Sequence, residues 1–145
     1  SAFTPDSQVH AYVSGTAIEI MNPSDNVLRA GLTPKHIDAE ELIKVLGEHQ
    51  DAPVLQRPEA NGLGVEQYAM WDERMSVQHI RVLADESVEY TFEGTSAALV
   101  VDGSVTISAG EQNITLCGTE SVLHAGDSTS VTITGEGELY IARYV

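Results

Sequence analysis

Cysteine is almost absent from this sequence of 145 residues. The single thiol, Cys117, cannot form a disulfide within the chain, so the cysteine usage does not indicate an oxidising compartment. Basic residues are also scarce: seven Lys and Arg stand against 22 Asp and Glu, which gives a formal net charge of −15. Because such a charge repels phosphate backbones and anionic lipid surfaces, we expect no nucleic-acid partner.

Long apolar runs are missing as well. The longest aliphatic stretches, such as residues 97–101, are far shorter than the roughly 20 residues that a membrane-spanning helix needs. No basic-then-apolar leader, sequence repeat, heptad pattern or low-complexity tract is found. We therefore expect a cytoplasmic protein with no membrane partner. Its 42% hydrophobic content is sufficient for a core of ordinary size.

Three regions differ in pattern: residues 1–37, 38–65 and 66–145. In the first region, residues 16–20 resemble a short strand, and residues 22–26 and 30–35 have the composition of turns. In the second, Asp38 and Glu41 form a capping box that predicts a helix, Leu42, Val45 and Leu46 give it an apolar face, and Gly47 ends it. Residues 48–64 are expected to form an irregular linker.

The third region consists of short β-rich runs separated by turn residues. Asp102-Gly103 is the strongest hairpin signal, because both residues tolerate the positive φ that a two-residue turn requires. About eight or nine short strands within some 80 residues predict an antiparallel barrel or jelly roll, and thus an all-β fold with one short helix.

Candidate functional residues are concentrated near the start of the chain. His10 and Tyr12 are two positions apart, so on an extended strand they would share a face. Taken alone, His10 is more often a core or surface residue than a metal ligand. Glu19 lies between Ile18 and Ile20, where a solvated outer face is the simpler interpretation.

Arg29 and Lys35 form a cationic loop on an otherwise acidic chain. Such a loop suits an anionic small ligand, because guanidinium and ammonium groups form charge-assisted hydrogen bonds with phosphate. Two ordinary surface cations are an equally good interpretation. His79 and His124 have no neighbouring ligand residue in the sequence, so we expect the β-rich region to bind no metal. Three further residues have no pairing at an informative spacing and are given no role: His36, His49 and Cys117.

The stretches "HAYVSG" and "IEIMNPSDNVLRAGLTPKHID" resemble the signature of class I, zinc-dependent mannose-6-phosphate isomerases. The resemblance implies that His10 is a zinc ligand and that Tyr12 and Glu19 line the sugar pocket. It also implies that Arg29 and Lys35 are catalytic cations. In that family the other zinc ligands lie upstream, in a catalytic cupin barrel.

The resemblance further implies that this chain is the C-terminal part of the enzyme. Residues 1–37 would be the last segment of the catalytic cupin barrel, residues 38–65 a helix and linker, and residues 66–145 a metal-free cupin-like barrel. The reaction would interconvert mannose 6-phosphate and fructose 6-phosphate with one zinc ion in the full-length enzyme. The chain alone, without its partner barrel, is expected to lack zinc and activity. The alternative is a stand-alone, non-enzymatic cupin-like module that binds a sugar or a protein.

Overall fold

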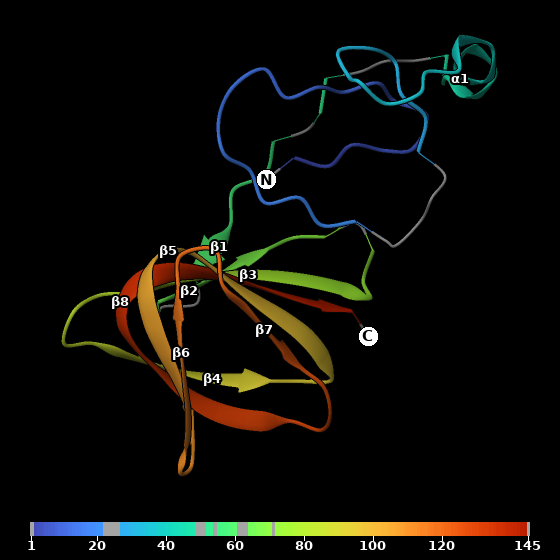
Figure 1. The fold of residues 1–145 in the computed structure, drawn as a ribbon. Helices are drawn as coiled ribbons and strands as arrows, with labels where there is room; N and C mark the ends of the chain where they lie inside the picture. Colours follow the sequence, from blue (N-terminus) through green and yellow to red (C-terminus); the bar gives the residue numbers. More distant parts are fainter. Residues whose placement is uncertain are drawn as a thin grey trace. The chain divides into compact units, whose positions relative to one another are not determined.

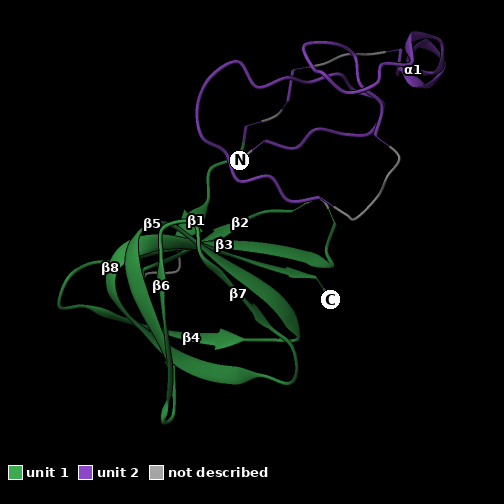
Figure 2. Cartoon of the chain, in the orientation of Figure 1, with its two compact units in different colours: residues 1, 56–145 green, residues 2–55 purple. Residues whose placement is uncertain are grey.

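The computed structural model describes residues 2–21, 27–48, 52, 53, 55–60, 64–70 and 72–144. The chain divides into two compact units, Ala2–Leu55 and Gln56–Val145 (Figure 2). The functional division at residues 37 and 65 stays a prediction. Among the described residues, no helix combines the length and the apolar character that crossing a membrane would require.

The first unit contains the predicted helix, α1 (Ala39–Val45). The Asp38 carboxylate accepts a hydrogen bond of 2.9 Å from the Glu41 backbone N–H, as an N-cap should. The Glu41 side chain does not complete the capping box but forms an ion pair of 3.0 Å with Lys44. The helix ends at Val45, which is 43% exposed, and no helical residue is fully buried. The predicted apolar face is therefore only partly covered.

The strand predicted for residues 16–20 is wrong, since these residues form no β pairing. A strand needs a neighbour to satisfy its backbone hydrogen bonds. Within the described part of this unit, the one such pairing is the isolated bridge between Ala2 and Leu55. His10 and Tyr12 also lie outside any strand. The turn predicted for residues 22–26, and His49, lie outside the described residues.

The second unit is an antiparallel sheet of eight strands (Figure 1). The main order is β1-β2-β3-β8-β5-β6, while β4 pairs with β8 and β7 pairs with β5. Among the described strands, β1 and β6 do not pair with each other, so the sheet is not closed. The bounds are β1 (Glu59–Ala60), β2 (Val65–Tyr68), β3 (Met75–Val82), β4 (Ser87–Phe92), β5 (Thr95–Ala109), β6 (Gln112–Cys117), β7 (Ser121–His124) and β8 (Thr129–Tyr144).

The hairpin predicted at Asp102-Gly103 is wrong, because β5 continues through these residues as one strand. The register changes there: Val100 faces Leu139, whereas Asp102 faces Glu138, so Val101 is an extra, unpaired residue. This is a β-bulge, in which the positive φ of Gly103 serves a bend of the strand and not a reversal of the chain. The buried positions change accordingly from even numbers before the bulge to odd numbers after it.

Glycines allow β5 and β8 to approach closely at this bend. Gly103 faces Gly137, and a Cβ added at Gly103 would lie 2.1 Å from the Glu136 carbonyl oxygen. On either side of the bend the two long strands have different neighbours. The half of β8 near Tyr144 pairs with β3, and the half near Thr129 pairs with β4. The sheet therefore folds over itself, as in sandwiches whose corners are made by bent strands.

The core is one cluster of aliphatic side chains contributed by both halves of the folded sheet. Val100 and Leu139 come from one side of the bend, Val105 and Ile133 from the other, and all four are 0% exposed. Burial of a side chain of this size stabilises the fold by about 1.5–3 kcal/mol.

Replacing Gly103 with alanine should therefore destabilise the sheet through a backbone collision as well as through an unfavourable φ. We expect Gly103→Ala to lower the free energy of unfolding by about 2–4 kcal/mol in urea denaturation. Gly110→Ala is the matched control, because Gly110 has a similar φ of +59° but no atom within 4 Å of an added Cβ. The control should lose only about 1 kcal/mol. Equal losses in the two variants would show that close packing at the bend is unimportant.

Candidate functional site

Three of the predicted site residues, His10, Tyr12 and Glu19, lie together in the first unit and are called the His10 cluster here. The rings of His10 and Tyr12 meet edge to face, with centroids 6.1 Å apart and an interplanar angle of 78°. The Tyr12 hydroxyl donates a hydrogen bond to the Glu19 carboxylate. The cluster therefore presents an imidazole, a phenol and a carboxylate side by side.

A bend at Ser14 and Gly15 accounts for this arrangement. Gly15 has a φ of +124°, a conformation that other residues rarely adopt. The bend returns the chain, so that Glu19 reaches Tyr12 although seven positions separate them in the sequence. A local turn, and not a strand, thus brings Tyr12 and Glu19 together.

The pKa of Tyr12 is raised above its ordinary value. Desolvation of the hydroxyl is the largest cause, followed by the negative charge of Glu19 and the hydrogen bond to its carboxylate. Tyr12 as a whole is nonetheless 68% exposed, so most of its surface is available to a ligand. A neutral phenol beside a carboxylate can donate to and accept from the hydroxyl groups of a sugar.

Arg29 and Lys35 lie in the irregular segment that precedes α1. Arg29 is half-buried, whereas Lys35 is exposed and donates its backbone N–H to the Thr33 hydroxyl at 3.2 Å. Within the described part of the chain, neither side chain forms an ion pair with a carboxylate, and no ion pair or hydrogen bond joins either of them to the His10 cluster. Among the described residues, no carboxylate therefore competes with an anionic ligand for either cation.

A complete metal site is not found among the described residues: no group of three or more His, Cys, Asp or Glu side chains lies close enough to hold a metal ion. His10 can serve as one ligand, because its ring is exposed and imidazole is a common zinc ligand. A catalytic zinc site generally has three protein ligands. Further ligands for a zinc ion at His10 would have to come from other parts of the protein.

His79, for which the sequence predicts no functional role, lies in a polar group with residues of β2 and β8. Its Nδ1 contacts the Glu66 carboxylate at 3.0 Å, and its ring stacks on Tyr140 with centroids 4.7 Å apart. Nε2 lies 3.5 Å from Glu138, an ion-pair separation whose geometry does not make a hydrogen bond. Burial, together with a hydrogen bond to Tyr140, raises the pKa of the nearby Tyr68 to about 12. No spacing in the sequence indicates this group, since the register of three strands assembles it.

His124 has a structural role in the second unit. Its Nδ1 lies 2.8 Å from the Gly94 carbonyl oxygen, and its Nε2 lies 3.0 Å from the Thr129 hydroxyl. The ring also stacks on Phe92, with centroids 5.3 Å apart. Since both ring nitrogens are hydrogen-bonded, His124 has no nitrogen available for a metal.

Comparison with known proteins gives a consistent result. No protein-family profile matches the sequence. The mannose-6-phosphate isomerase of Escherichia coli is 36% identical over 132 residues, which are 90% of this chain and 33% of the relative. Mannose-6-phosphate isomerase 2 of Arabidopsis thaliana is 30% identical over 134 residues, which are 92% of this chain and 30% of the relative.

Solved structures agree with the sequence comparison. The crystal structure of a point mutant of phosphomannose isomerase from Salmonella typhimurium matches 83% of this chain and 32% of its own, with a TM-score of 0.69 and 27% identity. The same enzyme bound to fructose 6-phosphate and zinc matches with a TM-score of 0.68 and 26% identity, over 83% of this chain and 31% of its own.

This chain resembles mannose-6-phosphate isomerases. It spans about a third of the length of the curated relatives that it matches. The resemblance carried by residues 10–15 and 18–38 is confirmed and extends over most of the chain. The all-β, cupin-like fold class with one short helix is also confirmed, although the sheet is not closed.

The contact between Tyr12 and Glu19 predicts a measurable titration effect. A carboxylate beside a phenol penalises the tyrosinate, so removal of its charge should lower the pKa of Tyr12 toward the ordinary value. We expect this decrease in Glu19→Gln when Tyr12 is titrated by NMR. Glu40→Gln, on the exposed first turn of α1, is the control and should leave the titration unchanged. An identical Tyr12 titration in all three proteins would contradict the contact.

Proposed function

We propose that this chain forms the C-terminal part of an aldose–ketose isomerase that interconverts mannose 6-phosphate and fructose 6-phosphate. The observation that carries the proposal is the similarity of 90% of the chain to curated mannose-6-phosphate isomerases. The structural likeness to a relative bound to fructose 6-phosphate and zinc supports the same substrate pair.

His10 would be one ligand of the zinc ion. Its exposed imidazole fits that role, and the contact with Tyr12 restricts the orientation of the ring. When bound, zinc would polarise substrate oxygens as a Lewis acid. The remaining ligands would come from the upstream catalytic barrel that the resemblance to mannose-6-phosphate isomerases implies. The described residues contain no group of ligands that could hold the ion alone.

Two variants of the Salmonella enzyme support the assignment of His10 and Glu19. In one crystallised variant a histidine is replaced by alanine, and in another a glutamate nine positions further on is replaced by alanine. His10 and Glu19 are also nine positions apart. Tyr12 and Glu19 would line the sugar pocket, where the phenol and the carboxylate hydrogen-bond to substrate hydroxyl groups.

Arg29 and Lys35 would supply positive charge to the reaction. Isomerisation removes the proton at carbon 2 and returns it at carbon 1, so negative charge develops on an enediolate. The guanidinium group of Arg29 can stabilise that charge where water is excluded. Lys35 would hold substrate oxygens or phosphate by charge-assisted hydrogen bonds.

A chimera tests the proposal directly. We expect an E. coli enzyme in which this chain replaces the matched third to bind zinc and to isomerise mannose 6-phosphate, whereas the 145-residue chain alone should be inactive. A folded, zinc-loaded chimera without turnover would contradict the proposal. Turnover by the homogeneous chain alone would contradict the assignment as a part of a larger enzyme.

In this chimera, Arg29→Ala should lower kcat by a factor of about 10²–10³ and change KM much less, because the interaction forms with charge that develops during the reaction. Lys44→Ala is the matched control. Lys44 lies on α1 and, among the described residues, is paired only with Glu41, so its replacement should have no effect on kcat. A kcat within twofold of the parent chimera would refute the role of Arg29.

Zinc content tests the role of His10 independently of activity. After dialysis against zinc-free buffer, His10→Ala should hold much less zinc than the parent chimera by mass spectrometry of the metal, since one ligand is lost. His36→Ala, which removes an exposed histidine of the same unit, should keep its zinc. Equal zinc contents in the two variants would mean that His10 is not a ligand.

A further inference from the structure

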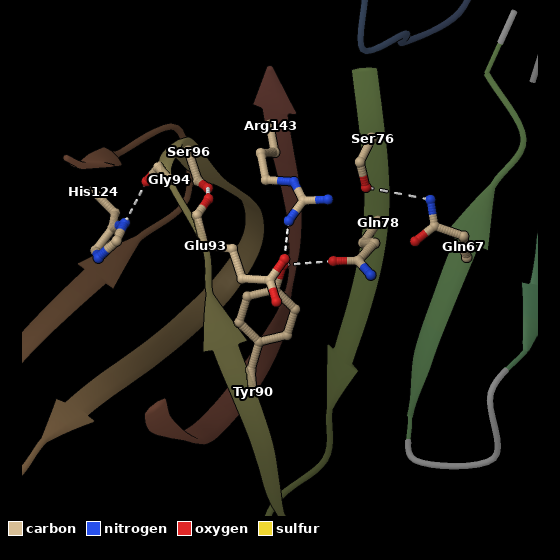
Figure 3. A network of polar contacts seen from close by, with 9 residues as sticks. All are labelled: Gln67, Ser76, Gln78, Tyr90, Glu93, Gly94, Ser96, His124 and Arg143. Atoms are coloured by element: carbon tan, nitrogen blue, oxygen red, sulfur yellow. Dashed lines mark hydrogen bonds and ion pairs between the residues drawn. The ribbon is translucent and has the colours of Figure 1, made fainter. Parts of the chain in front are cut away.

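The second unit contains a polar cavity that the proposed isomerase reaction does not use. Its volume is about 210 Å³. Strands β2, β3, β4 and β8 contribute most of its lining (Figure 3). The lining residues are Gln67, Ser76, Gln78, Tyr90, Thr91, Glu93, Ile141 and Arg143.

The cavity lies where the apolar core of the folded sheet ends. Along β8, Leu139, Ile141 and Arg143 point to the same side, because alternate residues of a strand share a face. Leu139 is 0% exposed in the core, whereas the Arg143 side chain is 31% exposed. On β3, Gln78 likewise lies beside the buried Ile80 on the same face, toward this end of the core. Polar side chains thus replace aliphatic ones at this end of the core.

Part of the hydrogen-bonding capacity of these side chains is satisfied internally. The Tyr90 hydroxyl donates to the side-chain amide oxygen (Oε1) of Gln78 at 2.5 Å, and Arg143 forms an ion pair with Glu93. The Gln67 amide nitrogen donates to the Val77 carbonyl oxygen at 3.3 Å. Figure 3 shows Tyr90, Glu93, Arg143 and Gln78 directed toward one another. These contacts hold the lining in place.

Other polar atoms of the lining have no partner among the described residues. The Arg143 Nε–H is buried without a hydrogen bond, and the Gln78 amide nitrogen donates to no described group. The Gln67 amide oxygen accepts from none. The cavity therefore offers donors and acceptors within a small space. A hydroxyl group both donates and accepts, so a compound with several hydroxyl groups suits this mixture.

The charges of the lining disfavour an anionic ligand. Arg143 is neutralised by Glu93, and a phosphate in the cavity would approach that carboxylate. Burial raises the pKa of Tyr90, so its phenol stays neutral at physiological pH. The volume is below the roughly 300 Å³ at which sites for drug-sized ligands begin, which limits the ligand to a small molecule.

We propose that this cavity binds a neutral polyhydroxyl compound of about monosaccharide size. The open amide and guanidinium groups of Gln67, Gln78 and Arg143 would bind its hydroxyl groups, and the ring of Tyr90 would contact its C–H face. The lining of this site belongs to the second unit and includes no residue of the His10 cluster.

NMR titration of the 145-residue chain tests the proposal, with D-mannose and D-mannitol as neutral probes and inorganic phosphate as an anionic one. We expect the neutral probes to shift the resonances of Gln67, Gln78 and Arg143 saturably, with a Kd of about 1 mM, as is usual for so small a ligand. Phosphate should not shift them. Saturable phosphate binding at these residues, or no shift with either neutral probe, would overturn the proposal.

Variants locate the binding. For the neutral probe that binds to the parent chain, Gln78→Ala should raise the Kd about tenfold, because hydrogen bonds are lost. Gln112→Ala makes the same change at an exposed position of β6 and should bind as the parent does. Tyr90→Phe removes only the hydroxyl and provides a second test if Gln78→Ala fails to fold. Unchanged affinity in a folded Gln78→Ala, or in Tyr90→Phe if Gln78→Ala fails to fold, would overturn the assignment to this cavity.

Discussion

The pairing of β5 with β8 is the interaction on which the sheet unit depends. It extends from Thr95 opposite Tyr144 to Ser108 opposite Thr132, and every other strand except β1 and β2 pairs directly with one of these two. The bulge at Val101 and the facing glycines at the bend let the pair fold over a single core. The same fold places Gln78 and Arg143 at the end of that core, so the polar cavity is also a product of this pairing.

Local signals in the sequence predicted local structure. Asp38 caps α1 because its carboxylate meets a backbone N–H only three residues away, and the β-rich runs became strands. Asp102-Gly103 was wrongly predicted to form a hairpin, because the positive φ of a glycine suits a bulge as well as a turn. The alternation of apolar residues along this segment could have indicated the bulge. The buried residues Ala98 and Val100 are even-numbered, whereas Val105 and Ile107 are odd-numbered, as one inserted residue requires.

The candidate site could be predicted only in part for a related reason. His10, Tyr12 and Glu19 are near in sequence, and the bend at Gly15 brings them together. The contacts of His79 with Glu66 and Glu138 depend on three strands whose register no spacing reveals. Arg29 and Lys35 are recognisable as a cationic loop, but no described carboxylate forms an ion pair with either side chain.

The position of β8 in the chain has a consequence for biosynthesis. This strand is the last of the eight to leave the ribosome, yet it is the direct partner of β3, β4 and β5. Until residues 129–144 are available, β4 has no described strand to pair with, and β3 and β5 each have one edge open. Open strand edges are templates for aggregation, and pairings between distant segments form slowly. The strand pairings of the sheet unit can therefore be completed only after residues 129–144 have been synthesised.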